Sequence, residues 1–351
     1  MEGQDKDRIS YLASLSIFFS ALELFIPKPL PFFRLGLANI PVLLALDMKG
    51  IPFLLLITLR AIGSSFVSGN LLSPFAMLSI AQAFASAYAM KAARLLFRDT
   101  VSLYSVSLIG AGISSSVQIA LAYLYIGRGV LAFFPAMLII SIPAAFLTAF
   151  LSQKLSLPEK APHLMFEEET GRNEWPVIAS LIASASAAMA MKSIAALCAA
   201  FILALILEKL SGRRIMLMPH ALMLLFMLIS SLFQPEGRIL FSILGARITE
   251  DALISAVRQS LRLSTAMALS QAYTPLIKAP GQILGKTLAY FSALMTAFRE
   301  TEGNMIKRIK DTLSLNILIN SKRKANNIPT VILFLFTAAF LLLLSLNTLL
   351  I

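Results

Sequence analysis

The sequence predicts an all-α, polytopic membrane protein with two helical membrane domains. Of its 351 residues, 58% are hydrophobic and only 14% are charged, and the mean hydropathy is +0.81. A soluble domain is nearer half apolar and a quarter charged, so these values exclude a soluble protein. The apolar residues also fall in stretches of about 20, the length that a membrane-spanning helix needs to satisfy its backbone groups without water.

Six apolar stretches come first in the chain. We expect membrane spans near 9–26, 35–48, 51–72, 75–97, 101–126 and 129–153. The first stretch follows a charged N-terminus without an A-x-A cleavage pattern, so we expect a retained span and not a signal peptide. The second is short and follows Pro27, Pro29 and Pro31. A re-entrant or tilted element is therefore the alternative to a full membrane crossing.

A polar stretch with Pro158, Pro162 and three consecutive glutamates interrupts the apolar pattern, and it is typical of a linker between domains. We therefore predict a membrane domain at 1–155, a linker at 156–176 and a second membrane domain at 177–351. The second domain should contain apolar runs near 177–193, 194–210 and 214–234, an amphipathic helix at 249–273, a polar amphipathic region at 281–325 and a last span at 328–351.

The charge distribution predicts the orientation. The formal net charge is +12, from 30 Lys and Arg against 18 Asp and Glu, which suits cytoplasmic loops and anionic lipid headgroups. With the N-terminus in the cytoplasm, the basic tract between Lys307 and Lys324 also lies there, as the positive-inside rule requires. No basic patch interleaves with aromatic residues, so we expect no nucleic-acid partner.

Polar residues within the apolar stretches mark a candidate site, because ionisable groups in membrane spans are costly. Glu23, Arg34 and Arg60 are the clearest charged examples. Helical spacing also places polar side chains on single faces of three spans, and such faces would line one polar cavity. These three faces carry Arg60, Ser64 and Ser68; Ser79, Gln82 and Ser86; and Ser107, Ser114 and Gln118.

Two structural interpretations compete with a ligand site. Serine and glutamine side chains also join helices through interhelical hydrogen bonds, and for a single serine this interpretation is favoured. Glu23 and Arg60 would also satisfy each other as an ion pair, which we weigh equally with a ligand site.

The motifs for catalysis are absent. Pro280–Thr287 resembles a phosphate-binding loop, but Pro280 stands where its first glycine belongs and no strand precedes it. The sequence has no D-D-x-x-D, G-x-S-x-G or H-E-x-x-H motif, so we expect no enzyme. His163 and His220 lack partners at ligand spacing, and Cys198 is the single cysteine, so we expect neither a metal nor a cofactor.

The N-terminal region resembles a known family. The segment Glu23–Pro31, followed by Arg34–Ile40, is similar to the Gx transporter family, which is also labelled heptaprenyl diphosphate synthase component I. The resemblance covers about residues 9–153. It implies a six-helix bundle like the substrate-binding S component of energy-coupling-factor (ECF) transporters in the bacterial cytoplasmic membrane. It further implies pocket residues at Glu23, Arg34, Asn39, Arg60 and Gln118.

The second half, roughly 177–351, resembles the T component of the same transporters. The residues that carry this resemblance include Phe233–Gly237 and Arg247–Leu253. The family's amphipathic coupling helices rest on two cytoplasmic ATPases through Ala-Arg-Gly motifs. The nearest basic positions in this sequence are Arg299, Lys307, Arg308, Lys310 and Arg323. Lodging of this region on anionic lipid is the alternative.

The sequence therefore predicts a fusion of an S-like substrate-binding domain with a T-like coupling domain, the membrane part of an uptake transporter. A first alternative is a non-catalytic membrane subunit that recruits a soluble prenyl diphosphate synthase. A second is a membrane scaffold without a ligand. Arg34 and Arg60 would suit an anionic group, unless an internal ion pair uses them.

Overall fold

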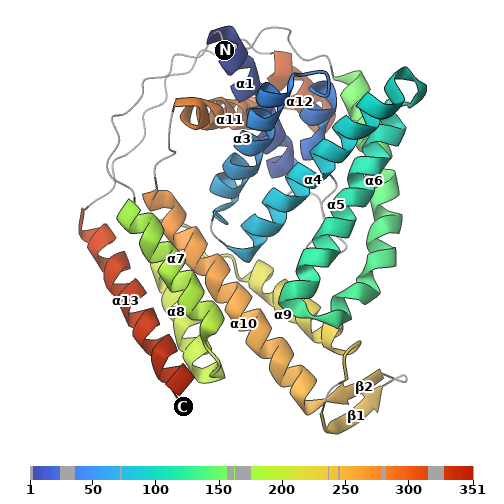
Figure 1. Cartoon of the computed structure of the whole chain (residues 1–351). Helices are drawn as coiled ribbons and strands as arrows, with labels where there is room; N and C mark the ends of the chain where they lie inside the picture. The colour runs from blue at the N-terminus through green and yellow to red at the C-terminus, as the bar shows by residue number, and fades with distance from the viewer. Residues whose placement is uncertain are drawn as a thin grey trace.

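The structure is a computed structural model that describes residues 3–23, 36–71, 73–155, 162, 175–235, 237–243, 246–277, 282–314 and 328–350. Arg34, Arg323 and most of the predicted linker lie outside these residues. The described chain is almost entirely helical and forms two groups of helices (Figure 1). This arrangement confirms the predicted all-α class.

The first group contains the N-terminal helices. They are α1 (Gly3–Leu22), α2 (Ile40–Leu44), α3 (Gly50–Ser68), α4 (Pro74–Phe97), α5 (Leu103–Ile126) and α6 (Phe134–Lys154). Short 3-10 helices, η2 (Leu37–Asn39), η3 (Arg98–Thr100) and η4 (Arg128–Phe133), connect some of them. Helix α1 packs against α3, α4 packs against α5, and α5 packs against α6 (Figure 1).

Local sequence signals explain where these helices begin and end. The Ser73 hydroxyl accepts a hydrogen bond from the Ala76 amide at 3.3 Å and so caps α4, whose first residue is Pro74. Ser102 caps α5 in the same way. Gly69 ends α3 with a φ of 74°, a left-handed conformation that glycine adopts without strain.

The element expected near 35–48 is too short to cross a membrane as a helix. It consists of η2 and the five-residue α2, and the next helix begins at Gly50. A crossing needs about 20 helical residues, so this segment matches the tilted or re-entrant alternative. Ile40, Val42 and Leu43 are buried against the bundle, which anchors the element.

The second group contains α7 (Trp175–Ala190), α8 (Ile194–Leu210), α9 (Leu217–Ser231), α10 (Glu250–Tyr273) and α13 (Ile328–Leu350). Helix α10 contacts α7, α8 and α9, and α13 packs against α7 (Figure 1). The buried Tyr273 hydroxyl donates a hydrogen bond to the Phe334 carbonyl at 2.8 Å and so ties α13 to the end of α10. The 3-10 helix η5 (Thr274–Leu276) follows α10 directly.

A β-hairpin, which the sequence analysis did not predict, precedes α10. Strands β1 (Ile239–Ile243) and β2 (Ala246–Thr249) pair antiparallel, with Ile239 opposite Thr249 and Ile243 opposite Ala246. The expected amphipathic helix at 249–273 is α10, which begins directly after the hairpin.

The predicted amphipathic region 281–325 forms α11 (Gln282–Glu300) and α12 (Met305–Ser314) within the described residues. These helices leave the second group: α11 packs against α1 and α3, and α12 packs against α11 (Figure 1). The C-terminal part of the chain thus contributes two helices to the N-terminal bundle.

The outer surface is that of a membrane protein. Three helical segments among the described residues are long and apolar enough to cross a membrane: Gly50–Ser68, Leu103–Ile126 and Arg128–Lys154. Shorter apolar helices lie at Trp175–Ala190, Leu217–Ser231 and Leu333–Leu346. Large apolar side chains such as Leu124, Ile139 and Phe336 are exposed, which is costly in water and favourable in lipid.

Candidate functional site

A polar cavity lies inside the N-terminal bundle, between α1, η2, α3, α4, α5 and α6. It contains about 810 Å³ of space not filled by atoms, including the part that opens to the outside. Its lining residues are Ser16, Ser20, Glu23, Gly36, Ala38, Asn39, Arg60, Ala61, Ser64, Ser79, Gln82, Ala83, Ser86, Ser107, Ala111, Ser114, Ser115, Gln118, Ser141, Ala144, Ala145 and Thr148.

The cavity brings together the polar faces that helical spacing predicted on three separate spans. The predicted candidates that line it include Glu23, Asn39, Arg60, Ser64, Gln82, Ser114 and Gln118. Arg34 lies outside the described residues. Ser68, the last member of the α3 face, is not in the lining, and its hydroxyl donates to the Ser65 carbonyl at 3.3 Å.

Sequence reasoning found Glu23 but missed Ser16 and Ser20 on α1 and the whole contribution of α6. Ser16, Ser20 and Glu23 recur at i, i+4 and i+7 along the end of α1, and Ser141 and Thr148 stand seven residues apart on α6. The same helical spacing that marked α3, α4 and α5 would have found both faces. The six alanines of the lining hold the helices close and leave the cavity its room.

Some lining residues join neighbouring helices. The Gln82 amide donates to the Gln118 carbonyl oxygen at 2.7 Å, and both side chains are buried, so this bond links α4 to α5. The Ser107 hydroxyl donates to the Ala145 carbonyl at 2.9 Å and links α5 to α6. These two contacts match the interhelical role that the sequence analysis weighed for serine and glutamine.

Other lining groups have hydrogen-bonding capacity that faces the cavity. Among the described residues, the buried Ser16 Oγ and Asn39 Oδ1 have no hydrogen-bond partner. The Glu23 carboxylate accepts a hydrogen bond from the Ala38 amide at 3.4 Å and is buried. Burial of a polar atom without a partner is costly, so a polar occupant or water in the cavity would stabilise these groups.

The lining is rich in hydrogen-bonding side chains. Its hydroxyl and amide groups can both donate and accept hydrogen bonds, its carboxylate can accept them and its guanidinium can donate them. In the part of the chain that the structure describes, no three His, Cys, Asp or Glu residues lie close enough to hold a metal ion. His220 lies on α9, edge-on to the Phe201 ring at 5.0 Å.

The basic residues predicted to couple to partners divide into two kinds. Arg299, Lys307 and Lys310 are exposed on α11 and α12. The Arg308 guanidinium instead lies 4.1 Å from the centre of the Phe298 ring and donates to the Phe298 carbonyl. Arg308 therefore holds α12 against the end of α11. Arg323 lies outside the described residues.

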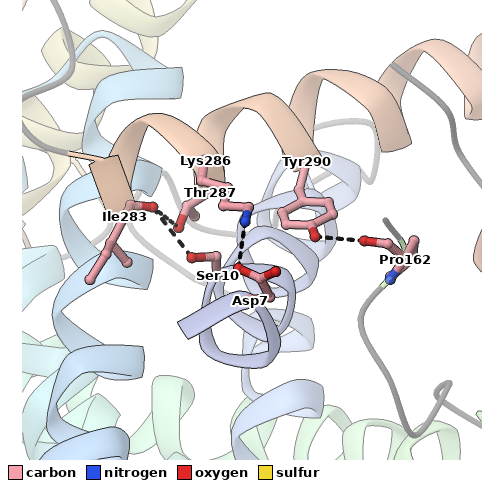
Figure 2. A network of polar contacts seen from close by, with 7 residues as sticks. All are labelled: Asp7, Ser10, Pro162, Ile283, Lys286, Thr287 and Tyr290. Carbon is pink, nitrogen blue, oxygen red and sulfur yellow. Dashed lines mark hydrogen bonds and ion pairs between the residues drawn. The ribbon is translucent and has the colours of Figure 1, made fainter. Parts of the chain in front are cut away.

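A polar network joins α11 to the N-terminal part of α1 (Figure 2). Lys286 forms an ion pair with Asp7, the Ser10 hydroxyl donates to the Ile283 carbonyl at 3.4 Å, and the Tyr290 hydroxyl donates to the Pro162 carbonyl at 2.7 Å. Burial, with the nearby Asp7 charge, raises the pKa of Tyr290, so this hydroxyl stays protonated and keeps donating.

Aromatic contacts between α1 and α11 extend this interface toward the cavity. The rings of Tyr11 and Tyr290 meet edge to face at 5.6 Å, and those of Phe18 and Phe298 do the same at 5.6 Å. Helix α1 thus contacts α11 along most of its length, and the end of α1 carries Ser16, Ser20 and Glu23 into the cavity.

Comparison with known proteins finds two family models that match parts of the chain. Residues 178–273 match the model of a domain of unknown function, DUF8519. No curated protein and no solved structure matches the chain. Residues 12–155, which include every lining residue of the cavity, match the model of heptaprenyl diphosphate synthase component I. Over these residues the chain is therefore similar to the heptaprenyl diphosphate synthase component I family.

Proposed function

We propose that this protein is a membrane component of an ECF-type uptake transporter and that it binds a small molecule in the cavity of its N-terminal bundle. The observation that carries the proposal is the cavity itself. A bundle with an apolar outer surface gathers polar side chains from six elements around one internal space. Polar groups in such a position are costly without a function, because lipid offers them no hydrogen bonds.

Coupling would pass through α11, α12 and α1. In this proposal two cytoplasmic ABC-type ATPases contact the exposed Arg299, Lys307 and Lys310. A displacement of α11 would move α1 through the ion pair between Lys286 and Asp7 and through the aromatic contacts. The orientation that this requires places the N-terminus in the cytoplasm, as the positive-inside rule predicts.

The test is purification of the tagged full-length protein from its native membranes in mild detergent, followed by mass spectrometry of the proteins that accompany it. We expect stoichiometric ATPases. A triple variant with Arg299, Lys307 and Lys310 changed to alanine should lose them, because these side chains would form the contact.

The control removes three exposed basic residues elsewhere, Lys192, Lys209 and Arg214, and should retain the ATPases. Equal loss in both variants would contradict a specific contact and indicate general charge attraction. Absence of ATPases from the wild-type preparation would refute the transporter proposal.

The family description favours a second candidate, a non-catalytic membrane subunit of a heptaprenyl diphosphate synthase. The same purification distinguishes the two candidates. A soluble prenyl diphosphate synthase that accompanies the protein without ATPases would establish the second candidate in place of the first.

A further inference from the structure

Two arginines lie one helical turn apart on α10, in the second group of helices. The Arg262 guanidinium donates hydrogen bonds from Nε and Nη2 to the Met191 carbonyl, at 3.0 and 2.6 Å, and so caps the end of α7. Arg258 precedes it by four residues and is half-buried. The Arg258 Nε atom is buried and has no hydrogen-bond partner among the described residues. Residues four apart are neighbours on one face of a helix, so the two positive charges lie side by side.

The acidic residues of α10 stand apart from this arginine pair. Glu250 and Asp251 precede Arg258 by eight and seven residues, which is about 10 Å along the helix. The Asp251 carboxylate lies against Gly237, and Glu250 is exposed. Within the described part of the chain, neither forms an ion pair with an arginine of α10. The positive charge of the pair is therefore left without a close counter-charge there.

The two guanidinium groups repel each other. Burial, and then the neighbouring Arg258 charge, lower the pKa of Arg262. Guanidinium nevertheless stays protonated in proteins, so loss of a proton does not relieve the repulsion. An anion bound beside both side chains would relieve it.

Exposed apolar side chains lie at the same end of α10. Ile254 precedes Arg258 by one turn on the same face of the helix, and its side chain is exposed. Phe233, Ile239 and Leu240, in and before the hairpin that leads into α10, are about half exposed. Such side chains are costly in water and favourable in lipid. Positive charges beside an apolar surface complement a molecule with an anionic head and hydrocarbon chains.

We propose that Arg258 and Arg262 bind the phosphate group of an anionic phospholipid, whose acyl chains lie along the exposed apolar side chains at this end of α10. Guanidinium donates parallel hydrogen bonds to phosphate oxygens, and Arg258 is available for them. Arg262 keeps its bonds to Met191 and contributes its charge. The hairpin end of α10 lies at the opposite end of the molecule from α11 and α12, so this site is independent of the proposed ATPase contact (Figure 1).

The experiment measures ligand-induced stabilisation of the purified full-length protein after exchange into detergent without added lipid. The probes are dioleoylphosphatidylglycerol, which is anionic, and dioleoylphosphatidylcholine, which has the same chains and no net charge. Inorganic phosphate is the third probe. A ligand that binds the folded state raises the unfolding temperature. We expect saturable stabilisation by phosphatidylglycerol and at least tenfold weaker binding of phosphatidylcholine.

Variants locate the binding at the arginine pair. Arg258→Gln should weaken phosphatidylglycerol binding at least tenfold, the size of one hydrogen bond to a charged group. Arg258→Lys keeps the charge but not the fork of donors, so its binding should lie between those of Arg258→Gln and the wild type. The matched control is Arg214→Gln, at an exposed position in the loop before α9, and it should bind as the wild type does.

The unfolding temperature without lipid separates a ligand site from a structural role. Arg258→Gln should then unfold at the wild-type temperature or slightly above it, because it removes the repulsion from Arg262. With phosphatidylglycerol the order should reverse. A lower unfolding temperature of Arg258→Gln without lipid would show that Arg258 stabilises the protein by itself, and would overturn the inference.

Other outcomes also overturn the inference. Equal binding of the two phospholipids would show that the acyl chains alone decide. Stabilisation by inorganic phosphate without stabilisation by phosphatidylglycerol would replace the lipid by a soluble phosphate. Equal weakening in Arg258→Gln and Arg214→Gln would indicate general charge attraction. If phosphatidylglycerol does not stabilise the wild type, the lipid site is refuted, and the ATPase purification still decides the transporter proposal separately.

Discussion

The close contact between the two helix groups at Gly129 predicts a measurable effect of a single methyl group. Gly129 lies in η4, between α5 and α6, and faces the end of α9. A Cβ atom at this position would lie 2.3 Å from the Ser230 carbonyl oxygen and 2.7 Å from its hydroxyl. Contacts below 3.0 Å essentially never occur for real Cβ atoms, and a backbone carbonyl has little freedom to move away. Gly129→Ala must therefore push α9 away from η4.

The cost follows from the packing around this contact. Overpacking of a well-packed contact typically costs about 1–3 kcal/mol of the free energy of unfolding. The neighbouring Phe133 and Phe226 rings, whose centres are 4.8 Å apart, would separate as well. Such a ring pair contributes about 0.5–1.5 kcal/mol. We therefore expect Gly129→Ala to lower the free energy of unfolding by an amount in the upper part of the overpacking range.

The assay is thermal unfolding in mild detergent, followed by circular dichroism at the helical band. The matched control is Gly112→Ala on α5, where a Cβ atom would meet nothing within 4 Å. Because alanine favours a helix over glycine by about 1 kcal/mol, the control should unfold at the wild-type temperature or above it. Gly129→Ala should unfold several degrees lower. If Gly129→Ala unfolds at the same temperature as the wild type and Gly112→Ala, the close approach of the two helix groups is refuted.

Two further predictions concern polar contacts. Gln82→Leu and Gln118→Leu should each destabilise the protein. Their coupling energy in a double-mutant cycle should be about 0.6–1.7 kcal/mol, as for other buried membrane-protein hydrogen bonds. Gln153→Leu, at an exposed position, serves as the control, and a coupling energy near zero would contradict the hydrogen bond between α4 and α5. Lys286→Met should lower the free energy of unfolding at low salt by only about 0.2–1 kcal/mol, because the pair is partly exposed. The charge swap Asp7→Lys with Lys286→Asp should restore the loss, and an effect that high salt does not reduce would argue against an ion pair.

Local periodicity explains why much of the site was predictable. Polar residues at i, i+3, i+4 and i+7 show which face of a helix is polar, so the residues on α3, α4 and α5 could be named from the sequence. The same pattern on α1, with Ser16 and Ser20, passes unnoticed beside the charged Glu23. Arg308 shows what the sequence could not predict. A basic residue in an amphipathic helix looks the same in the sequence whether its side chain faces a partner protein or bonds to a neighbouring helix, as Arg308 does.

The sequence by itself determined the membrane class, the order of the helices and the polar faces, because hydropathy and helical spacing are local properties of the chain. Only the tertiary structure decided that these faces meet in one cavity, that α11 and α12 pack on α1 and that a hairpin precedes α10. The physical reason is that lipid is as apolar as the side chains facing it. Hydropathy therefore marks a helix as buried in the membrane without specifying which helix lies beside it.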